Sequence, residues 1–391
     1  MATNSRPTRP AGQRPTGSNR PNGASNNMRR RKKSSKRKSI IFIFEILIIL
    51  VMLGGYYIIT RTTNGEGPKR ADIVFDDADI GIVAKPIDPV KGQEEVAREG
   101  YLNVALFGVD ARKESELYKG SRSDSIMIAS INMDTGDIKL VSVYRDTFLN
   151  LGDDSYRKCN HAYAYGGAEQ AIKMLNINLD MDIRNFVTVG YKGLIDVIDG
   201  LGGIYLDIDD TEIKHINNYQ ITIVNDVTKG SYTPITKTGY QKVDGLQAAA
   251  YCRIRYGGGD DFKRASRQRE VIKAIEEQAK QTDFLKLQEV FNKAIGNVYT
   301  NIDNDTILDL IKNITKYSIV EEDGFPQENM RTTGNIGAKG SSVIPLDLSS
   351  NVVWLHQFLF EDKDYQVPST VAEYGKKIKN ETSPYLNRTA E

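Results

Sequence analysis

Cysteine and histidine are scarce in this sequence of 391 residues, which contains two Cys and three His. Two cysteines exclude a disulfide-dense scaffold and a four-cysteine zinc site. The histidines, His161, His215 and His356, are too scattered to indicate a zinc site by their spacing. A G-x-S-x-G nucleophile elbow and a Walker phosphate loop are also missing from the sequence, so neither a hydrolase of that type nor a P-loop NTPase is indicated.

The net charge is only +1, but this balance combines two unlike parts. Residues 1–38 contain 12 Lys or Arg and no Asp or Glu, which leaves 40 basic and 51 acidic residues in 39–391 and a net charge of −11 there. The basic part could indicate nucleic-acid binding. A topology signal that also favours anionic lipid headgroups is the simpler interpretation, and we expect no nucleic-acid partner.

One long apolar run, Ile40–Ile59, follows the basic part. About 20 apolar residues are enough for a helix to span a membrane. The run contains one charge, Glu45, near its start, and Tyr56 and Tyr57 suit the opposite interface. The positive-inside rule places the basic flank in the cytoplasm, so we expect a single-pass membrane protein whose main domain is extracytoplasmic. A cleaved signal peptide is the alternative, which the length and late start of the segment disfavour.

The remaining patterns divide the chain into five expected segments. These are a basic disordered tail (1–38), a transmembrane helix (39–60), a stalk (61–98), a folded domain (99–320) and a C-terminal extension with short helices (321–391). In the folded domain, apolar runs typical of strands are expected at 102–109, 125–132, 138–144, 186–191 and 204–208. Helices are expected at 168–177, 194–201, 264–281, 283–296 and 304–318. Their alternation predicts an α/β fold with α-β-α layers around a central mixed sheet.

Arginine and aspartate recur where the expected strands begin or end. The set comprises Asp110, Arg122, Asp124, Arg145, Arg253, Arg255, Asp261, Arg264 and Gln268. Arg253 and Arg255 are two positions apart, which on a strand would place both guanidiniums on one face. Because ligands of α/β sheets commonly bind at strand ends, we expect these side chains to line one crevice.

The chemistry of this set suits a pyrophosphate diester. Guanidinium groups pair bidentately with phosphate oxygens. Carboxylates such as Asp110 and Asp124 can hold Mg²⁺, or Mn²⁺, through oxygen ligands shared with phosphate and water. The alternative is a set of solvated surface ion pairs that contribute about 0–1 kcal/mol each.

The sequence resembles the LytR-CpsA-Psr family over about residues 101–280. The resemblance rests on seven blocks in order, LNVALFGVDAR, RSDS, VSVYRDT, NHAYAYGG, DVIDGLGGI, GLQAAAYCRIR and DDFKRASRQ. Members of the family are membrane-anchored phosphotransferases. They take a glycopolymer from a polyprenyl-pyrophosphate carrier and attach it through a phosphodiester to a peptidoglycan sugar hydroxyl. Teichoic acid, capsule and other wall glycans share this pyrophosphate, so the resemblance implies the class of donor only.

The resemblance also implies roles for individual residues. The pyrophosphate would be bound by Arg122, Arg145, Lys158, Arg253, Arg255, Arg264 and Gln268, and Mg²⁺ by Asp110 and Asp124. Asp110, Arg145 and Asp261 would be catalytic, and either Asp110 or Asp261 could take the hydroxyl proton. The lipid tail would lie in an apolar tunnel between sheet and helices, for which the faces around 168–201 and 271–296 are candidates, although a closed core explains them as well.

The same residues are also compatible with other functions. A lipid-pyrophosphate hydrolase would use the same site with water in place of the sugar hydroxyl. A non-catalytic lipid- or wall-binding protein, or a transcriptional attenuator, is a further alternative, although the sequence contains no helix-turn-helix signature. Cys159 and Cys252 could form a disulfide across the site, but two small buried residues are the simpler interpretation.

Overall fold

The computed structural model describes residues 73–82, 100–111, 114–255, 261–302 and 317–386. The expected basic tail and transmembrane helix lie outside these residues, as do most of the stalk and of the helix expected over 304–318. Among the helices that the structure does describe, none combines the length and the apolar character needed to cross a membrane.

A six-stranded mixed sheet forms the centre of the fold, in the order β10-β3-β2-β1-β6-β9. Its strands are β1 (Tyr101–Val109), β2 (Ser123–Asn132), β3 (Asp137–Val143), β6 (Asn185–Val189), β9 (Val298–Thr300) and β10 (Ser318–Phe325). The pairs β1–β6 and β3–β10 are parallel and the other three pairs are antiparallel. The prediction of a central mixed sheet is therefore confirmed.

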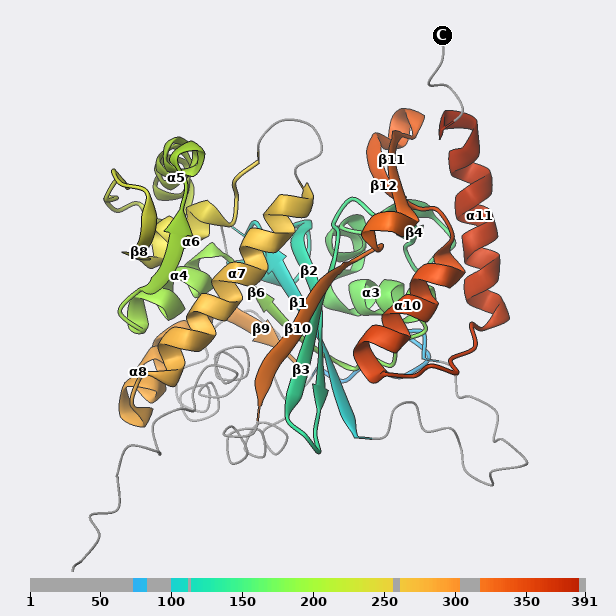
Figure 1. The fold of residues 1–391 in the computed structure, drawn as a ribbon, viewed down its shortest axis with the longest axis horizontal. Helices are drawn as coiled ribbons and strands as arrows, with labels where there is room; N and C mark the ends of the chain where they lie inside the picture. The colour runs from blue at the N-terminus through green and yellow to red at the C-terminus, as the bar shows by residue number, and fades with distance from the viewer. Residues whose placement is uncertain (1–72, 83–99, 112–113, 256–260, 303–316, 387–391) are drawn as a thin grey trace, which may run out of the picture. The chain divides into compact units, whose positions relative to one another are not determined.

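Helices cover both faces of this sheet (Figure 1). One face carries α4 (Tyr191–Gly200), α5 (Asp210–Ile223), α6 (Gly245–Tyr251), α7 (Asp261–Lys280), α8 (Phe284–Ala294) and the hairpin of β7 (Ile204–Ile208) and β8 (Gly239–Val243). The other carries α3 (His161–Leu179), α10 (Leu348–Phe360) and α11 (Ser369–Leu386). Two further hairpins pair β4 (Phe148–Asn150) with β5 (Tyr156–Lys158) and β11 (Arg331–Asn335) with β12 (Ser341–Pro345). Short helical turns occupy Glu114–Leu117, Val224–Thr228, Ile295–Asn297, Glu328–Met330 and Gly337–Lys339.

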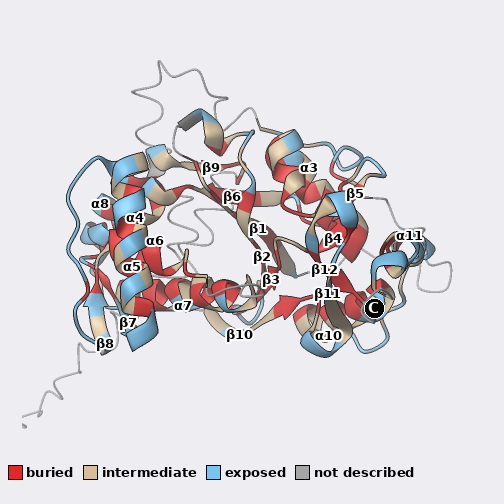
Figure 2. Cartoon of the chain, turned by 90° about the horizontal axis from the view of Figure 1, so that it is seen from above, coloured by how far each residue is buried: buried red, intermediate tan, exposed pale blue. Residues whose placement is uncertain are grey.

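Alternation along the strands produces two hydrophobic cores. Successive side chains of a strand point to opposite faces, so Val104 packs into the core beneath α4–α8, whereas Ala105 and Phe107 pack into the core beneath α3 and α10. Figure 2 shows these buried strands between the two helical layers. The sheet is thus held between the two helical layers. The candidate functional site lies along the edge of the sheet that is formed by strand ends.

Local sequence explains where several helices begin. Asp209 and Glu212 form a capping box at the start of α5, and Asp244 and Gln247 form one at the start of α6. The helix expected at 168–177 begins earlier, at His161, and is kinked at Gly167. Gly167 has a φ of 68°, and a Cβ there would lie 2.5 Å from the Tyr118 carbonyl oxygen, so only glycine fits.

Two expectations about the later part of the domain need correction. The Arg253-x-Arg255 motif does not lie on a strand, because α6 continues into a helical turn in which the Cys252 N–H donates to the Ala248 carbonyl. The boundary expected between residues 320 and 321 falls inside β10, which pairs with β3 in the central sheet. The sheet therefore extends into the segment expected as a C-terminal extension.

Candidate functional site

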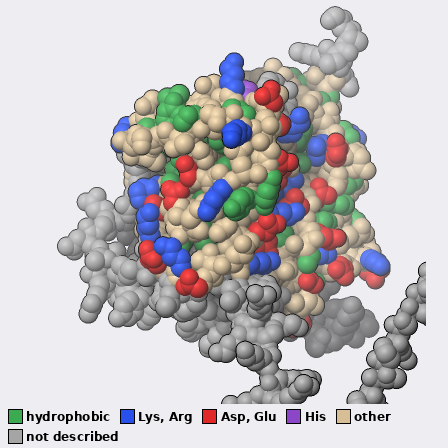
Figure 3. All heavy atoms as spheres, turned by 60° about the vertical axis from the view of Figure 1, so that its left-hand side comes forward, with side chains coloured by type: hydrophobic (Ala, Val, Ile, Leu, Met, Phe, Trp, Pro, Cys, Tyr) green, Lys and Arg blue, Asp and Glu red, His purple; other side chains and the backbone are tan. Residues whose placement is uncertain are grey.

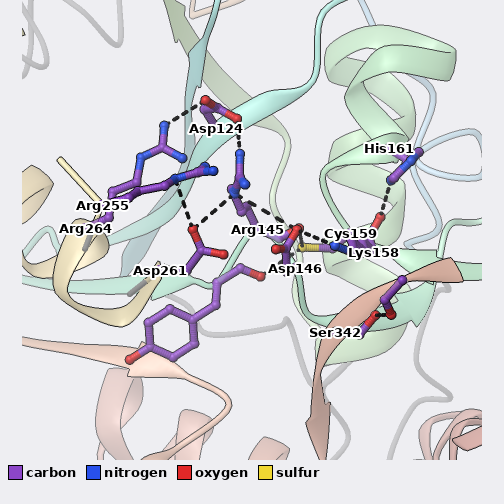
Figure 4. A network of polar contacts seen from close by, with 12 residues as sticks. Asp124, Arg145, Asp146, Lys158, Cys159, His161, Arg255, Asp261, Arg264 and Ser342 are labelled. Atoms are coloured by element: carbon purple, nitrogen blue, oxygen red, sulfur yellow. Dashed lines mark hydrogen bonds and ion pairs between the residues drawn. The ribbon is translucent and has the colours of Figure 1, made fainter. Parts of the chain in front are cut away.

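Three strand ends meet at one edge of the central sheet. Val109, at the end of β1, pairs with Ser123, at the start of β2, because these strands are antiparallel. β3 is antiparallel to β2 in turn, so its end, followed by Arg145, lies at the same edge. The first residues of α7 approach this edge from above the sheet and complete the site (Figure 4).

Asp124 joins two arginines at this edge. Its Oδ1 accepts from Arg145 Nη1 at 2.6 Å, and its Oδ2 accepts from Arg264 Nη2 at 2.7 Å. Burial raises the pKa of Asp124, but the charges and hydrogen bonds of Arg264 and Arg145 outweigh burial and lower this pKa to about 2. Asp124 is therefore a carboxylate at physiological pH, bound by two guanidinium groups.

Asp261 joins a second pair of arginines. Its Oδ1 lies 3.3 Å from Arg145 Nε and 3.6 Å from Arg255 Nε. Arg145 thus bridges Asp124 and Asp261, and the predicted residues Arg145, Arg255 and Arg264 lie in one ion-pair network with both aspartates (Figure 4).

Two buried donors in this network make no hydrogen bond to a protein atom of the described residues, namely Arg145 Nε and Arg264 Nη1. Arg145 Nε keeps only the ion pair with Asp261 Oδ1 at 3.3 Å. The Arg264 side chain is only 5% exposed. An unsatisfied buried donor costs about 1–3 kcal/mol, which an anion bound at this point would offset.

An apolar cavity of about 180 Å³ opens beside the network. Its polar lining consists mainly of Asp124, Arg253, Arg264 and Gln268, and its apolar lining comes from β1, β2, β6, α4 and α7. Val271, Ile272 and Ile275 follow Gln268 along α7, so the cavity becomes apolar with distance from the arginines. Only parts of the two faces expected to line an apolar tunnel do line this cavity, namely residues between 187 and 197 and residues between 271 and 275. The rest of the first face, on α3, packs in the core on the other side of the sheet.

Arg253 and Arg255 have different surroundings. The Arg253 guanidinium lies over two tyrosine rings, 5.0 Å from the centroid of Tyr191 and 5.4 Å from that of Tyr219. These contacts hold Arg253 at the cavity wall, whereas Arg255 points to Asp261. The two arginines reach the same site, although they do not share a strand face.

The other predicted residues lie around this centre. Asp110 directly follows β1, and its charge acts together with that of Asp124 on Tyr191, whose pKa is raised first of all by burial. Arg122 is exposed just before β2. Burial lowers the pKa of His161, and the charge of Arg122 lowers it further.

Asp146 is a site residue that the sequence prediction missed. Its Oδ1 lies 3.4 Å from Lys158 Nζ, and its carboxyl group hydrogen-bonds to that of Asp261. Burial and this hydrogen bond raise the pKa of Asp146. Burial by itself would raise the pKa of Asp261. The charge of Arg145 and the hydrogen bond from Asp146 outweigh burial and lower this pKa. The pKa values of the two carboxyl groups are thus shifted in opposite directions, and the only sequence signal for Asp146 was its position next to Arg145.

Both cysteines are free thiols. Cys159 is fully buried beneath the site, where its Sγ lies 3.2 Å from the Tyr144 carbonyl oxygen. Cys252 lines the apolar cavity. The interpretation of a small buried residue therefore fits Cys159, whereas Cys252 is only partly buried, and the disulfide does not fit the structure.

The carboxylates fit a hard cation such as Mg²⁺ in their donor chemistry. The described part of the chain contains no group of three or more His, Cys, Asp or Glu placed to hold a metal. Mg²⁺ often binds through one or two carboxylates and completes its shell with phosphate and water. Asp110 and Asp124 are the two carboxylates expected to act in this way, and each Asp124 oxygen keeps a lone pair beside its bond to arginine.

Comparison with known proteins identifies relatives of the chain. The model of the LytR_cpsA_psr family matches residues 82–349. Biofilm regulatory protein A of Streptococcus mutans is 28% identical over 249 residues, which are 59% of this chain and 59% of that protein. A Bacillus cereus protein named polyisoprenyl-teichoic acid--peptidoglycan teichoic acid transferase TagU is 29% identical over 228 residues, 57% of this chain and 68% of that protein. The chain thus spans about three fifths to two thirds of the length of these relatives.

Solved structures show the same fold. Protein gbs0355 from Streptococcus agalactiae has a TM-score of 0.55 and 24% identity, with 68% of this chain and 90% of that chain covered. TagV of B. subtilis has a TM-score of 0.51 and 25% identity, with 69% and 99% covered. These structures support the mixed α/β architecture described above.

Proposed function

Since the chain belongs to the LytR-CpsA-Psr family, we propose that it is a membrane-anchored phosphotransferase of cell-wall assembly. The donor is a glycopolymer on a polyprenyl-pyrophosphate carrier, and the acceptor is a peptidoglycan sugar hydroxyl. The segment at 39–60 anchors the chain, and the domain described here acts outside the membrane.

One observation supports this proposal above all, namely the unsatisfied arginine donors beside an apolar cavity. Arg145 Nε and Arg264 Nη1 can each donate to a phosphate oxygen. The cavity begins at Arg264 and becomes apolar along α7, as a ligand with an anionic head and a prenyl tail requires. A nucleic acid or an unlipidated phosphate would leave the apolar part unused. On the face in Figure 3, basic and acidic side chains of the described residues are interspersed, so a broad basic surface is absent there.

The proposed chemistry depends on positioning and charge. The acceptor oxygen forms a bond to the phosphorus next to the glycan, and the bond from this phosphorus to the bridging oxygen breaks, so polyprenyl monophosphate leaves. Arg145, Arg255 and Arg264 stabilise the negative charge that moves onto the leaving phosphate. Asp110 or Asp261 accepts the hydroxyl proton.

Mg²⁺ would be held by Asp110 and Asp124 and would supply further charge stabilisation. The Arg253 guanidinium, fixed by Tyr191 and Tyr219, binds the pyrophosphate at the mouth of the cavity. Apolar side chains beyond Gln268 bind the prenyl chain and keep water from its first units.

The test uses the full 391-residue chain in detergent micelles with Mg²⁺, a polyprenyl-pyrophosphate saccharide and a peptidoglycan oligosaccharide. We expect covalent transfer, and a loss of about 100-fold or more in Arg145→Ala and in Asp110→Ala. Arg184→Ala is the matched control, because the half-exposed Arg184 side chain contacts Asp77 and the Asp182 carbonyl oxygen and the variant should behave as wild type. Release of polyprenyl phosphate without acceptor labelling would identify a hydrolase instead, and tight lipid binding with neither product would exclude both enzymatic functions.

A further inference from the structure

Arg331, at the start of β11, lies between two aromatic rings. Its guanidinium carbon is 3.9 Å from the centroid of Phe262 and 4.8 Å from that of Tyr144. The two rings also touch edge to face, with centroids 4.6 Å apart. Arg331 Nη1 donates to the Pro326 carbonyl oxygen at 2.9 Å and to the Tyr144 hydroxyl at 3.4 Å. The guanidinium is thus fixed by hydrogen bonds and stacking together.

Each ring is next to a site residue in the sequence. Tyr144 directly precedes Arg145, and Phe262 directly follows Asp261. The ion pair between Arg145 Nε and Asp261 Oδ1, at 3.3 Å, therefore lies beside the contact between the rings. Any change in how the rings pack alters the position of the end of β3 relative to the start of α7.

The hairpin that carries Arg331 also supports the backbone at this point. The Val343 N–H of β12 donates to the Asp146 carbonyl oxygen at 2.9 Å. Val343 also packs with Tyr144, Phe262 and Ala265 in a small apolar cluster. None of the arginines and aspartates of the site lies on the β11–β12 hairpin. The hairpin thus contacts both segments that carry these residues, the end of β3 and the start of α7.

We propose that Arg331 is a positioning residue for phosphoryl transfer. Its guanidinium holds the ring that precedes Arg145 against the ring that follows Asp261. It thereby keeps the Arg145–Asp261 ion pair in position relative to the pyrophosphate. The inference rests on the proposed function and extends it to the C-terminal hairpin. A displacement of about 1 Å in such a site can cost about 100-fold in rate. The apolar cavity has other walls, so binding of the prenyl chain does not depend on Arg331.

The first test compares steady-state transfer by the full chain with variants of Arg331. We expect Arg331→Ala to lower kcat by about 10- to 100-fold, while KM for the lipid donor stays within about threefold. Arg331→Lys should recover part of kcat, because an ammonium keeps the charge but cannot lie flat against both rings. The matched control is Lys339→Ala. Lys339 lies on the same hairpin, where its Nζ is 5.0 Å from the Phe148 centroid and pairs with Glu381, and its removal should leave kcat near wild type.

A second measurement does not depend on activity. The Tyr144 N–H donates to the Phe325 carbonyl at 3.0 Å, and the Thr147 N–H donates to the Tyr144 carbonyl at 2.8 Å. Hydrogen–deuterium exchange at these amides should be faster in Arg331→Ala and unchanged in Lys339→Ala. Gly324→Ala is an independent variant, because its Cβ would lie 2.1 Å from the Tyr144 hydroxyl and would displace the ring. It should lower kcat in the same way, because it disturbs the same ring contacts from the Tyr144 side while the Arg331 side chain is retained.

Several results would overturn the inference. Wild-type kcat in Arg331→Ala would do so, and so would equal losses in Arg331→Ala and Lys339→Ala, which would indicate general destabilisation. Unchanged exchange in Arg331→Ala would show that no clamp exists. If the wild-type chain transfers no glycan, the proposed function fails, and the exchange measurement still decides whether Arg331 holds the two segments.

Discussion

Replacing Asp124 by asparagine should destabilise the fold by an amount that follows from the lowered pKa of Asp124. The pKa of Asp124 is about 2 in the folded chain, against 3.8 as its ordinary value. At about 1.36 kcal/mol per pH unit, this difference corresponds to about 2 kcal/mol of stability at pH 7. Asparagine resembles the protonated carboxyl, which keeps the shape but loses the attraction to Arg145 and Arg264. Asp124→Asn should therefore lower the free energy of unfolding by about 2 kcal/mol and the thermal midpoint by about 4–8 °C.

The pH dependence distinguishes this cause from a packing defect. Because the folded pKa is depressed, the contribution is complete above the unfolded pKa and is lost as the pH falls towards 2. The deficit of Asp124→Asn should thus shrink to about 1 kcal/mol at pH 3. Thermal unfolding of the full chain followed by circular dichroism measures both values. Asp77→Asn is the control and should cost at most about 1 kcal/mol, since Asp77 and Arg184 are both half exposed. Wild-type stability in Asp124→Asn at pH 7, or a deficit independent of pH, would refute the reasoning.

Two further predictions concern the cavity and the thiols. Val271, which is 1% exposed, lines the cavity, so Val271→Trp should fill it and raise KM for a long-chain lipid donor about 10-fold or more, while inhibition by inorganic pyrophosphate stays unchanged. Equal weakening of both ligands would place the prenyl chain elsewhere. Since both cysteines are free, a reductant should leave the thermal midpoint unchanged. Burial raises the pKa of the Cys252 thiol to about 12, so iodoacetamide at pH 8 should label this partly buried thiol more slowly in the folded chain than after unfolding, and equal labelling rates would contradict the raised pKa.

The periodicity of apolar residues was sufficient to predict the strands and helices whose burial follows a regular pattern. The central strands β1–β3 and the helices α7 and α8 were predicted close to their observed bounds. Their apolar residues recur with the spacing expected of elements that are buried on one or both faces. β10 was not predicted, because Glu321, Glu322 and Asp323 interrupt its apolar pattern. It lies at the edge of the sheet, where Glu322 pairs with Lys273 at 3.0 Å, so its stability depends on a partner distant in sequence.

The candidate site was predictable where its residues follow strands, and less so elsewhere. Arg145 and Asp124 were placed together because both lie next to expected strand ends, where ligands of α/β sheets commonly bind, and the antiparallel pairing of β2 and β3 does bring them to one edge. The strand expected at Arg253 was wrong, although the capping box of Asp244 and Gln247 and the alanines after it already favour a helix. Arg331 has no local signal, because it meets Tyr144 across 187 residues of sequence.

The pKa of Asp124 also limits which carboxylate can serve as the base. A carboxylate with a pKa of about 2 is a weak proton acceptor near neutral pH, so Asp124 is better suited to hold guanidinium groups than to deprotonate a sugar hydroxyl. Burial of Asp261 is outweighed by the charge of Arg145, so the pKa of Asp261 is lowered as well and the same argument weighs against Asp261 as the base. The pKa of Asp146 is raised by burial and by its hydrogen bond to Asp261, so these two carboxyl groups would titrate as a pair. If Asp261 is nevertheless the base of the proposed transfer, the proton that it accepts would be distributed over this pair, and Asp146 would then contribute to the proposed acid–base chemistry.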